Sequence, residues 1–344
     1  MTGDPRRTLE AILDGPGAVA VFLADMSLGA EPRIEVLSGG VSSELIRVSS
    51  ADRCVVVKRA LEELRVAAVW RSRPERSLIE ARCARLLDEL VPGSVPRVLA
   101  DLPDRLAFVM ACAPDRSETW KERLLRGEVE PELAANVGTL LGRIHARSAS
   151  RPGTAAEFAD RSFFEELRLD AYFRHVRGAH PDLAPALDQL IAGLDGPGLC
   201  LVHGDFSPKN LLVTPDGGVL LLDHEVAHWG QPAFDAAFVV SHLMLKSVLR
   251  RDAGPAYTDA AQTLLAAYRE AAGKELAEAA TGPFGATVLG GLLLARIDGK
   301  SPVEYLETEP DRDLVRGIAR RVLLGGAGSI DEVVALVAES VGNG

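Results

Sequence analysis

The chain has 344 residues, a length that suggests about two domains. Hydrophobic residues make up 47% and charged residues 25%, which is ordinary for a globular protein. The formal net charge is −11, and no block of Lys and Arg gives the basic patch that a nucleic-acid-binding protein usually carries. The acidity is compatible with a cationic substrate, and it is also a common solubility feature.

No apolar run approaches the roughly 20 residues that are needed to span a bilayer. The first residues also lack the uninterrupted apolar core of a secretory signal. We therefore expect a cytoplasmic protein whose partners include neither nucleic acid nor a membrane. The oligomeric state that we expect is a monomer or a homodimer.

The four cysteines, Cys54, Cys83, Cys112 and Cys200, are scattered without a Cys-x-x-Cys pair. This spacing argues against a structural zinc site and against a disulfide framework. We expect buried, reduced thiols.

The first third of the chain predicts a small sheet. A short helix (6–13) and a second apolar segment (18–26) precede three strand-like runs that are rich in Val, Ile and Leu. Apolar residues at helical spacing then predict a helix within 72–90, which Pro92 and Gly93 end. The predicted strands cover residues 33–37, 43–50, 53–60, 95–100 and 105–114.

From residue 115 the pattern changes to long amphipathic segments, so we place a domain boundary at residues 112–114. Only 199–213 and 218–227 look β-like there, and they are joined by a hairpin-type turn, Thr-Pro-Asp-Gly-Gly. The expected fold is α+β, with a small antiparallel-sheet lobe (1–111) and a larger, mainly helical lobe (112–344). The predicted helices of the second lobe cover residues 131–149, 162–176, 183–194, 233–250, 256–272, 284–297, 311–324 and 330–341.

Two carboxylate-bearing segments point to phosphoryl transfer, which needs metal ligands and a group that orients the attacking hydroxyl. Asp205 lies where an apolar run stops at a polar loop, a place from which a rigid carboxylate can accept a hydroxyl proton. Asn210 follows five residues later. Asp223 ends the next strand, which the turn would set beside Asn210, and Glu225 can complete a Mg²⁺ shell directly or through water.

The stretch from His224 to His228, HEVAH, also fits the zinc-protease pattern H-E-x-x-H. That pattern needs both histidines on one face of a helix. Here a strand precedes His224, and Trp-Gly-Gln-Pro follows His228, so we reject the zinc interpretation.

The motifs HGDFSPKN, LLLDHE and GQPAFD together resemble those of the aminoglycoside phosphotransferase and choline-kinase-like superfamily. The D-x-E spacing and ARIDGKSPVEYL are most similar to its methylthioribose-kinase-like branch. The resemblance covers roughly residues 33–300 and implies a protein-kinase-like bilobal fold that uses ATP and Mg²⁺. It implies that Asp205 is the catalytic aspartate, that Asn210 and Asp223 bind metal, and that Asp235 braces the catalytic loop.

The resemblance also assigns roles in the first lobe. Lys58 would pair the α- and β-phosphates and a helix glutamate, for which Glu80 is favoured over Glu75. The turn between the first two strands would cover the phosphates, using residues Gly39, Gly40, Ser42 and Ser43. The stretch that contains Met110 and Cys112 would pass the adenine and offer it backbone groups.

The acceptor would be a hydroxyl of a small molecule such as an aminoglycoside, a sugar or thiosugar, or an amino alcohol. Arg296 and Lys300 are candidate acceptor-binding residues, with surface charges as the competing interpretation. Ser207 stands where relatives carry Lys or His, and Lys209 either reaches the γ-phosphate or faces solvent. Two alternatives stay open at this point, a protein serine/threonine kinase and a catalytically silent nucleotide-binding pseudokinase.

Overall fold

The structure is a computed structural model that describes residues 4–29, 31–37, 42–63 and 72–342. It divides into two compact units, Met1–Pro114 and Asp115–Gly344, which we call unit 1 and unit 2. This division lies next to the boundary that we placed at residues 112–114.

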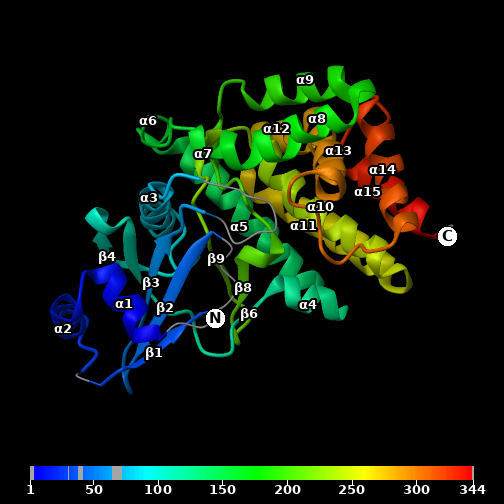
Figure 1. Ribbon diagram of the computed structural model, residues 1–344. Coiled ribbons are helices and arrows are strands. Elements are labelled where there is room, and N and C mark those ends of the chain that lie inside the picture. The colour runs from blue at the N-terminus through cyan, green and yellow to red at the C-terminus, as the bar shows by residue number, and fades with distance from the viewer. Residues whose placement is uncertain (1–3, 30, 38–41, 64–71, 343–344) are drawn as a thin grey trace. The chain divides into compact units, whose positions relative to one another are not determined.

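Unit 1 is built on a five-stranded antiparallel sheet in the order β1-β2-β3-β5-β4 (Figure 1). Its central strand is therefore β3, which carries Lys58. The described elements of unit 1 are α1 (Pro5–Leu13), α2 (Pro16–Asp25), β1 (Arg33–Val36), β2 (Ser43–Ser49), β3 (Cys54–Ala60), α3 (Arg76–Leu90), β4 (Val98–Leu102), η1 (Pro103–Arg105) and β5 (Ala107–Ala111).

The two faces of this sheet have different partners because side chains alternate along a strand. On one face Val55 and Val57 of β3 join a buried apolar cluster with residues of α1 and α2. Val56 and Lys58 project to the other face, and α3 contacts β3, β4 and β5. The second apolar segment, which had no assigned structure, is thus helix α2, and with α1 it covers the sheet.

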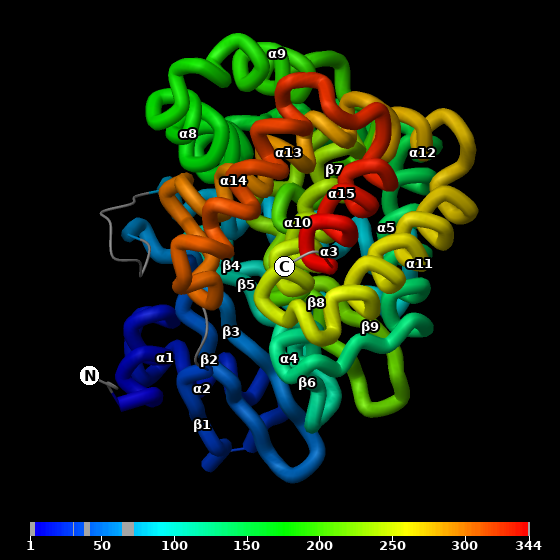
Figure 2. Tube along the Cα trace, turned by 90° about the vertical axis from the view of Figure 1, so that its right-hand side faces the viewer, coloured from blue at the N-terminus to red at the C-terminus, as the bar shows by residue number. Residues whose placement is uncertain are grey.

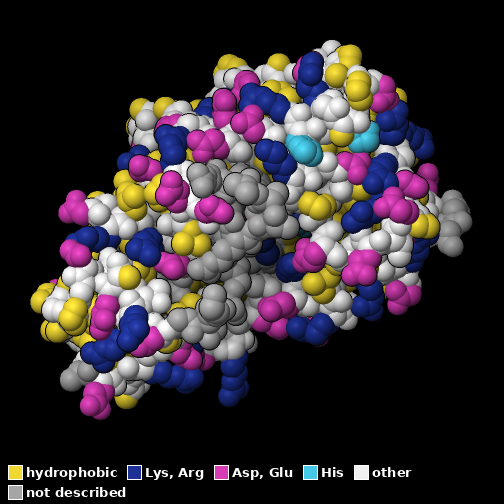
Figure 3. Space-filling model, viewed as in Figure 1, with side chains coloured by type: hydrophobic (Ala, Val, Ile, Leu, Met, Phe, Trp, Pro, Cys, Tyr) yellow, Lys and Arg dark blue, Asp and Glu magenta, His cyan; other side chains and the backbone are white. Residues whose placement is uncertain are grey.

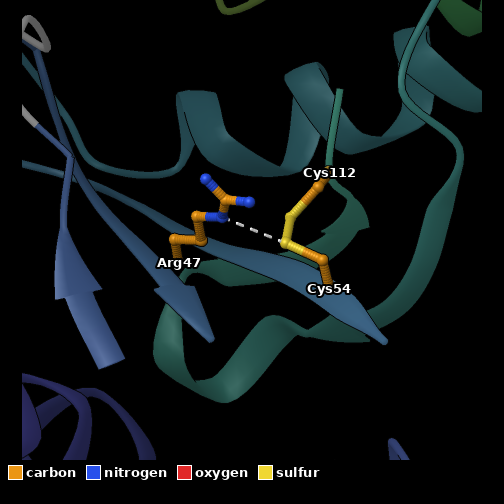
Figure 4. The surroundings of a disulfide bond; sticks show 3 residues. All are labelled: Arg47, Cys54 and Cys112. Carbon is orange, nitrogen blue, oxygen red and sulfur yellow. Dashed lines mark hydrogen bonds between the residues drawn. A yellow bond between two sulfur atoms is a disulfide. The ribbon is translucent and has the colours of Figure 1, made fainter. Parts of the chain in front are cut away.

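The expectation of four reduced thiols is wrong for two of the cysteines. Cys54 and Cys112 form a disulfide, with their Cα atoms 5.5 Å apart (Figure 4). The cause is tertiary: the antiparallel register pairs Val55 with Ala111, which brings the flanking cysteines together although 58 residues separate them. The guanidinium of Arg47 on β2 lies beside this bond, with its Nε 3.2 Å from Sγ of Cys54. Cys83 and Cys200 are buried, reduced thiols, as expected.

Unit 2 is mainly helical. Its described strands are β6 (Glu118–Thr119), β7 (Cys200–Val202), β8 (Leu211–Val213), β9 (Val219–Leu221) and β10 (His228–Gly230). Its described helices are α4 (Trp120–Arg126), α5 (Pro131–Ser150), α6 (Thr154–Glu157), α7 (Ser162–Phe164), the π-helix η2 (Glu165–Arg174), α8 (His175–Ala179), α9 (Ala184–Leu194), α10 (Ala233–Leu249), α11 (Gly254–Ala272), α12 (Lys274–Thr281), α13 (Pro283–Asp298), α14 (Glu309–Leu323) and α15 (Ile330–Gly342), with short 3₁₀ turns η3 (Pro181–Leu183), η4 (Pro208–Asn210) and η5 (Arg251–Ala253).

Two small antiparallel sheets carry the loops of interest. Strands β8 and β9 form the predicted hairpin, and β6 adds to it as a third strand. Strand β7 pairs with β10. Sequence patterns did not reveal β6 and β10, because strands of two or three residues are too short to show an alternation.

The core of unit 2 surrounds helix α10, in which every residue from Ala233 to Val248 is buried. Figure 2 shows α10 among α11, α13, α14 and α15, and it contacts each of them. Helices α5 and α11 pack so closely that a Cβ on Gly138 would lie 2.1 Å from the carbonyl oxygen of Leu264. The stretch Lys274–Asp298 has the length and composition of a membrane span, but 83% of its most apolar window is buried inside the protein, as in a core helix.

We expect the Cys54–Cys112 disulfide to contribute to the stability of unit 1. Closing a loop of this length restricts the unfolded chain, so reduction or the Cys112→Ser substitution should lower the free energy of unfolding by about 2–4 kcal/mol. Urea unfolding with and without dithiothreitol measures this change, and alkylation with mass spectrometry counts the thiols. The Cys112→Ser protein should not respond to dithiothreitol, and a wild-type protein with four alkylatable thiols before reduction would contradict the assignment.

Candidate active site

The loop that carries Asp205 is held in place by Asp235, a residue of α10 with no exposed surface. Its two carboxylate oxygens accept the backbone N–H groups of His203 (2.6 Å) and Gly204 (2.9 Å). His145 Nε2 lies 3.4 Å from the same carboxylate. Gly204 has φ +76°, and a Cβ there would lie 2.8 Å from Val226, so both backbone and space require glycine. The predicted bracing role of Asp235 therefore corresponds to two backbone hydrogen bonds.

Asp205 is 3% exposed and lies between two cations. Its Oδ2 is 2.9 Å from Nζ of Lys209 and 3.2 Å from Nη2 of Arg168. Burial alone would raise the pKa of Asp205, but the charges of Lys209 and Arg168 more than offset this effect and hold the pKa below its usual value. Asp205 is thus an ionised, fixed carboxylate, as a proton acceptor must be.

Arg168, on the π-helix η2, is a site residue that the sequence analysis missed. Its Nε donates to the carbonyl of Gly204 at 2.6 Å, so it holds both the backbone and the carboxylate of the loop. It is 6% exposed. Its place between Leu167 and Leu169, in an apolar part of a predicted helix, was the available signal. π-Helical turns are rare and occur frequently at functional sites.

His203 links the Asp205 loop to the next one. Its Nδ1 accepts the backbone N–H of Asp205 at 3.1 Å, and its Nε2 donates to the carbonyl of Leu222 at 3.1 Å. Burial lowers the pKa of His203, which keeps the ring neutral with one donor and one acceptor. Because Leu222 precedes Asp223, this ring ties the predicted catalytic and metal-binding positions together.

The predicted metal ligands lie at the end of the β8–β9 hairpin. The N–H of Leu222 donates to the carbonyl of Asn210 at 2.9 Å, which sets Asp223 beside Asn210. The amide nitrogen of Asn210 donates to the carboxylate of Asp205 at 2.8 Å. Asp223 has φ 68°, a left-handed conformation that is uncommon for a non-glycine residue and clusters at functional sites. Glu225, two residues on, is buried.

The side chains of Asn210, Asp223 and Glu225 fit a hard divalent cation, since carboxylate and amide oxygens are the donors that Mg²⁺ and Ca²⁺ prefer. They do not make a zinc site of the H-E-x-x-H type. His224 lies in a turn and His228 in strand β10, so the two imidazoles do not share a helix face. His228 Nδ1 instead bonds to the carbonyl of Val226, and its ring stacks on Phe164.

In unit 1 the structure brings Lys58 and Glu80 together. Nζ of Lys58 lies 2.6 Å from Oε1 of Glu80, and both side chains are buried, with 7% and 5% exposed. Glu75 is exposed at the start of α3 and is not this partner. Lys58 is therefore a buried residue of the central strand, and its partner is the helix glutamate that the resemblance favoured.

The remaining unit 1 candidates have mixed outcomes. Gly39 and Gly40 lie outside the described residues. Ser42 and Ser43 are buried, and the carbonyl of Ser42 accepts Nη2 of Arg76. Met110 pairs with both Val56 and Val98 inside the sheet. The amide of Cys112 donates to the carbonyl of Cys54 at 3.4 Å, so the structure does not leave this amide free for adenine.

The candidate acceptor-binding residues differ in how far they are buried. Arg296 is only 9% exposed, which rules out a mere surface charge, whereas Lys300 is exposed. Lys209 has 51% of its side chain exposed, and its Nζ pairs with the carboxylate of Asp205 at 2.9 Å, so it does not merely face solvent. Its contact with the γ-phosphate stays a prediction.

Comparison with known proteins identifies the class. The model of the phosphotransferase enzyme family APH matches residues 33–280, and the chain belongs to this family. The solved structure of an amicoumacin kinase in complex with AMP-PNP, Ca²⁺ and Ami is similar, at 13% identity and TM-score 0.54, covering 92% of this chain and 95% of that one. A choline/ethanolamine kinase family protein from Mesorhizobium loti is similar at 14% identity and TM-score 0.53, covering 95% and 99%.

Among curated proteins, a glucosamine kinase from Streptacidiphilus jiangxiensis is 33% identical over 154 residues. This match covers 39% of the chain and about a third (34%) of the length of that kinase. The structural similarities establish the kinase-like fold, and the family match makes the protein a phosphotransferase family member.

We expect Arg168→Met to lower kcat by about 10²-fold with little change in the KM for ATP, because it releases the Asp205 loop from its productive position. Steady-state kinetics measure both constants. Arg174→Met is the matched control, since Arg174 lies on the same helix but pairs with Asp170 at the surface. Equal kcat values for the two variants would show that Arg168 has no positioning role.

Proposed function

We propose that the protein transfers the γ-phosphoryl group of ATP to a hydroxyl of a small molecule, with Mg²⁺ as the metal ion. The observation that carries this proposal is the Asp205 loop, in which one ionised carboxylate lies beside Asn210 and next to Asp223. Family membership supports phosphotransfer, and the nucleotide and Ca²⁺ bound to the similar amicoumacin kinase support nucleotide and divalent-metal use.

Each residue then has a chemical task. Asp205 orients the acceptor hydroxyl and accepts its proton as the oxygen forms a bond to the γ-phosphorus and ADP leaves. Lys58, held by Glu80, neutralises the α- and β-phosphates. Lys209, whose half-exposed side chain pairs with Asp205, would bind the γ-phosphate. Asn210, Asp223 and Glu225 would hold Mg²⁺, which when bound offsets phosphate charge.

The acceptor class is broad at this stage. The partial similarity to a glucosamine kinase favours a sugar-like acceptor, and the family gives no support to a protein serine/threonine kinase. ATP turnover with an acceptor separates an active kinase from a silent nucleotide-binding pseudokinase. We propose a cytoplasmic protein without nucleic-acid or membrane partners, although a structural disulfide is unusual in that compartment.

We expect Asp205→Asn to lower kcat by about 10²–10⁴-fold while AMP-PNP still binds, because only the proton acceptor is lost. A coupled assay of ADP release over a panel of hydroxyl acceptors measures turnover, and calorimetry measures AMP-PNP binding. Asp216→Asn, in the exposed turn of the β8–β9 hairpin, is the control and should keep full activity. Undiminished turnover in Asp205→Asn would refute the assignment.

We expect Asp223→Ala to abolish the effect of Mg²⁺ on nucleotide binding, since it removes a carboxylate ligand. AMP-PNP titrations with Mg²⁺ and with EDTA should differ in the wild type and coincide in the variant. If Mg²⁺ still strengthened AMP-PNP binding to the variant, the metal would have to bind elsewhere.

A further inference from the structure

Helices α10 and α13 of unit 2 each carry a buried cation that the phosphotransfer site does not use. Lys246 is 1% exposed and Arg296 is 9% exposed. Within the described part of the chain neither forms an ion pair with a carboxylate, and their hydrogen-bond partners are neutral groups. A buried charge normally has a counter-charge, because desolvation is costly.

The surroundings of Lys246 do not neutralise it. Its Nζ lies 3.4 Å from the carbonyl of His242 and 3.4 Å from the hydroxyl of Tyr305, and it stands 4.8 Å from the centre of the Tyr305 ring. Burial, followed by the charge of Lys121, lowers the pKa of Lys246 to about 7. Glu304 is the carboxylate that opposes this shift, but it is paired with Lys121.

Arg296 has an unused donor. Its Nη1 donates to Tyr172 (3.3 Å) and to Ser301, whereas its Nε is buried without a hydrogen-bond partner. Such orphaned donors are rare in native proteins, and they call for an explanation such as a missing ligand.

Lys246 and Arg296 lie on helices α10 and α13, which pack against each other. With Lys209 and Lys121 they form one cationic cluster around His242. The pKa of His242 is held well below its usual value by burial and then by the charges of Lys246, Arg296, Lys209 and Lys121. The positive charge of the cluster contrasts with the chain as a whole, whose formal net charge is −11. On the face shown in Figure 3, basic and acidic side chains are interspersed instead.

The cluster adjoins the phosphotransfer site through one aromatic ring. The guanidinium of Arg296 lies 5.7 Å from the centre of the Tyr172 ring, and that of Arg168 lies 5.6 Å from it. Arg168 in turn contacts Asp205. A molecule whose hydroxyl meets Asp205 therefore has this cationic cluster as a neighbour.

We propose that Lys246 and Arg296 form a subsite for a negatively charged group, a carboxylate or a phosphate, of the acceptor. The inference rests on the proposed phosphotransfer at Asp205 and narrows its substrate class. An anion supplies the missing counter-charge to Lys246 and an acceptor for Nε of Arg296, whose planar donors suit both groups. The same cluster repels an ammonium group, so an acidic sugar fits better than an amino sugar.

The test uses sulfate and acetate as small probes of the two anion classes, added to protein saturated with AMP-PNP and Mg²⁺ so that the nucleotide site is filled. We expect one of them to raise the melting temperature of the wild type and of Lys274→Met, an exposed-lysine control. The shift should be lost in Lys246→Met and Arg296→Gln. A rise with sulfate alone would indicate an acceptor that carries a phosphate, and a rise with acetate would indicate an acceptor that carries a carboxylate.

Two readouts separate this role from a structural one. Without anion, Lys246→Met should melt at a higher temperature than the wild type, because it removes an uncompensated buried amine. Anion affinity of the wild type should fall at least tenfold between pH 6 and pH 9, as Lys246 loses its proton. An equal anion effect in wild type and Lys246→Met, or no effect of either anion on the wild type, would overturn the proposal.

Acceptor screening completes the test. Sugar phosphates and sugar acids should give kcat/KM values at least tenfold above those of matched neutral and amino sugars. ADP release that depends on Asp205 but favours amino sugars would refute the subsite and leave the proposed phosphotransfer intact. A wild-type protein that does not bind AMP-PNP would instead contradict the phosphotransfer proposal itself.

Discussion

The buried carboxylate of Asp235 fixes the geometry on which the rest of the site depends. It accepts two consecutive backbone N–H groups, of His203 and Gly204, at the point where strand β7 ends. Consecutive N–H groups can both reach one carboxylate only if the chain turns sharply, and Gly204 permits that turn with its positive φ. The position of Asp205 is therefore set by a residue of the core helix α10, and the site inherits the rigidity of that core.

Charge compensation explains how each unit keeps ionised side chains largely away from water. In unit 1 Lys58 is paired with Glu80, and in unit 2 Asp205 is paired with Arg168 and Lys209. Buried pairs of this kind add little to stability compared with apolar residues, but loss of one partner leaves a costly charge. Their main effect is to fix the positions of the charged side chains.

The sequence predicted the parts of the site whose spacing is local. Asp205 and Asn210 share one loop, and the turn of the β8–β9 hairpin sets Asp223 by its length alone. Lys58 and Glu80 needed the family resemblance, because no local pattern relates a strand to a helix 22 residues away. Arg168 and the Cys54–Cys112 disulfide were missed for a common reason. Both depend on tertiary contacts between segments 36 or more residues apart, which periodicity cannot show.

Lys246 and Arg296 of unit 2 are exceptions to this pairing of buried charges. Folding would favour apolar side chains at Lys246 and Arg296, since both lie among the buried residues of α10 and α13. A protein can keep such a destabilising charge when its function needs a charged group in a site that excludes water. The net charge of −11 is a sum over the whole chain and does not describe this part of the interior, where Lys246, Arg296, Lys209 and Lys121 surround His242. The substrate preference of a phosphotransferase is therefore better inferred from the few buried charges beside its catalytic carboxylate than from the composition of the whole chain.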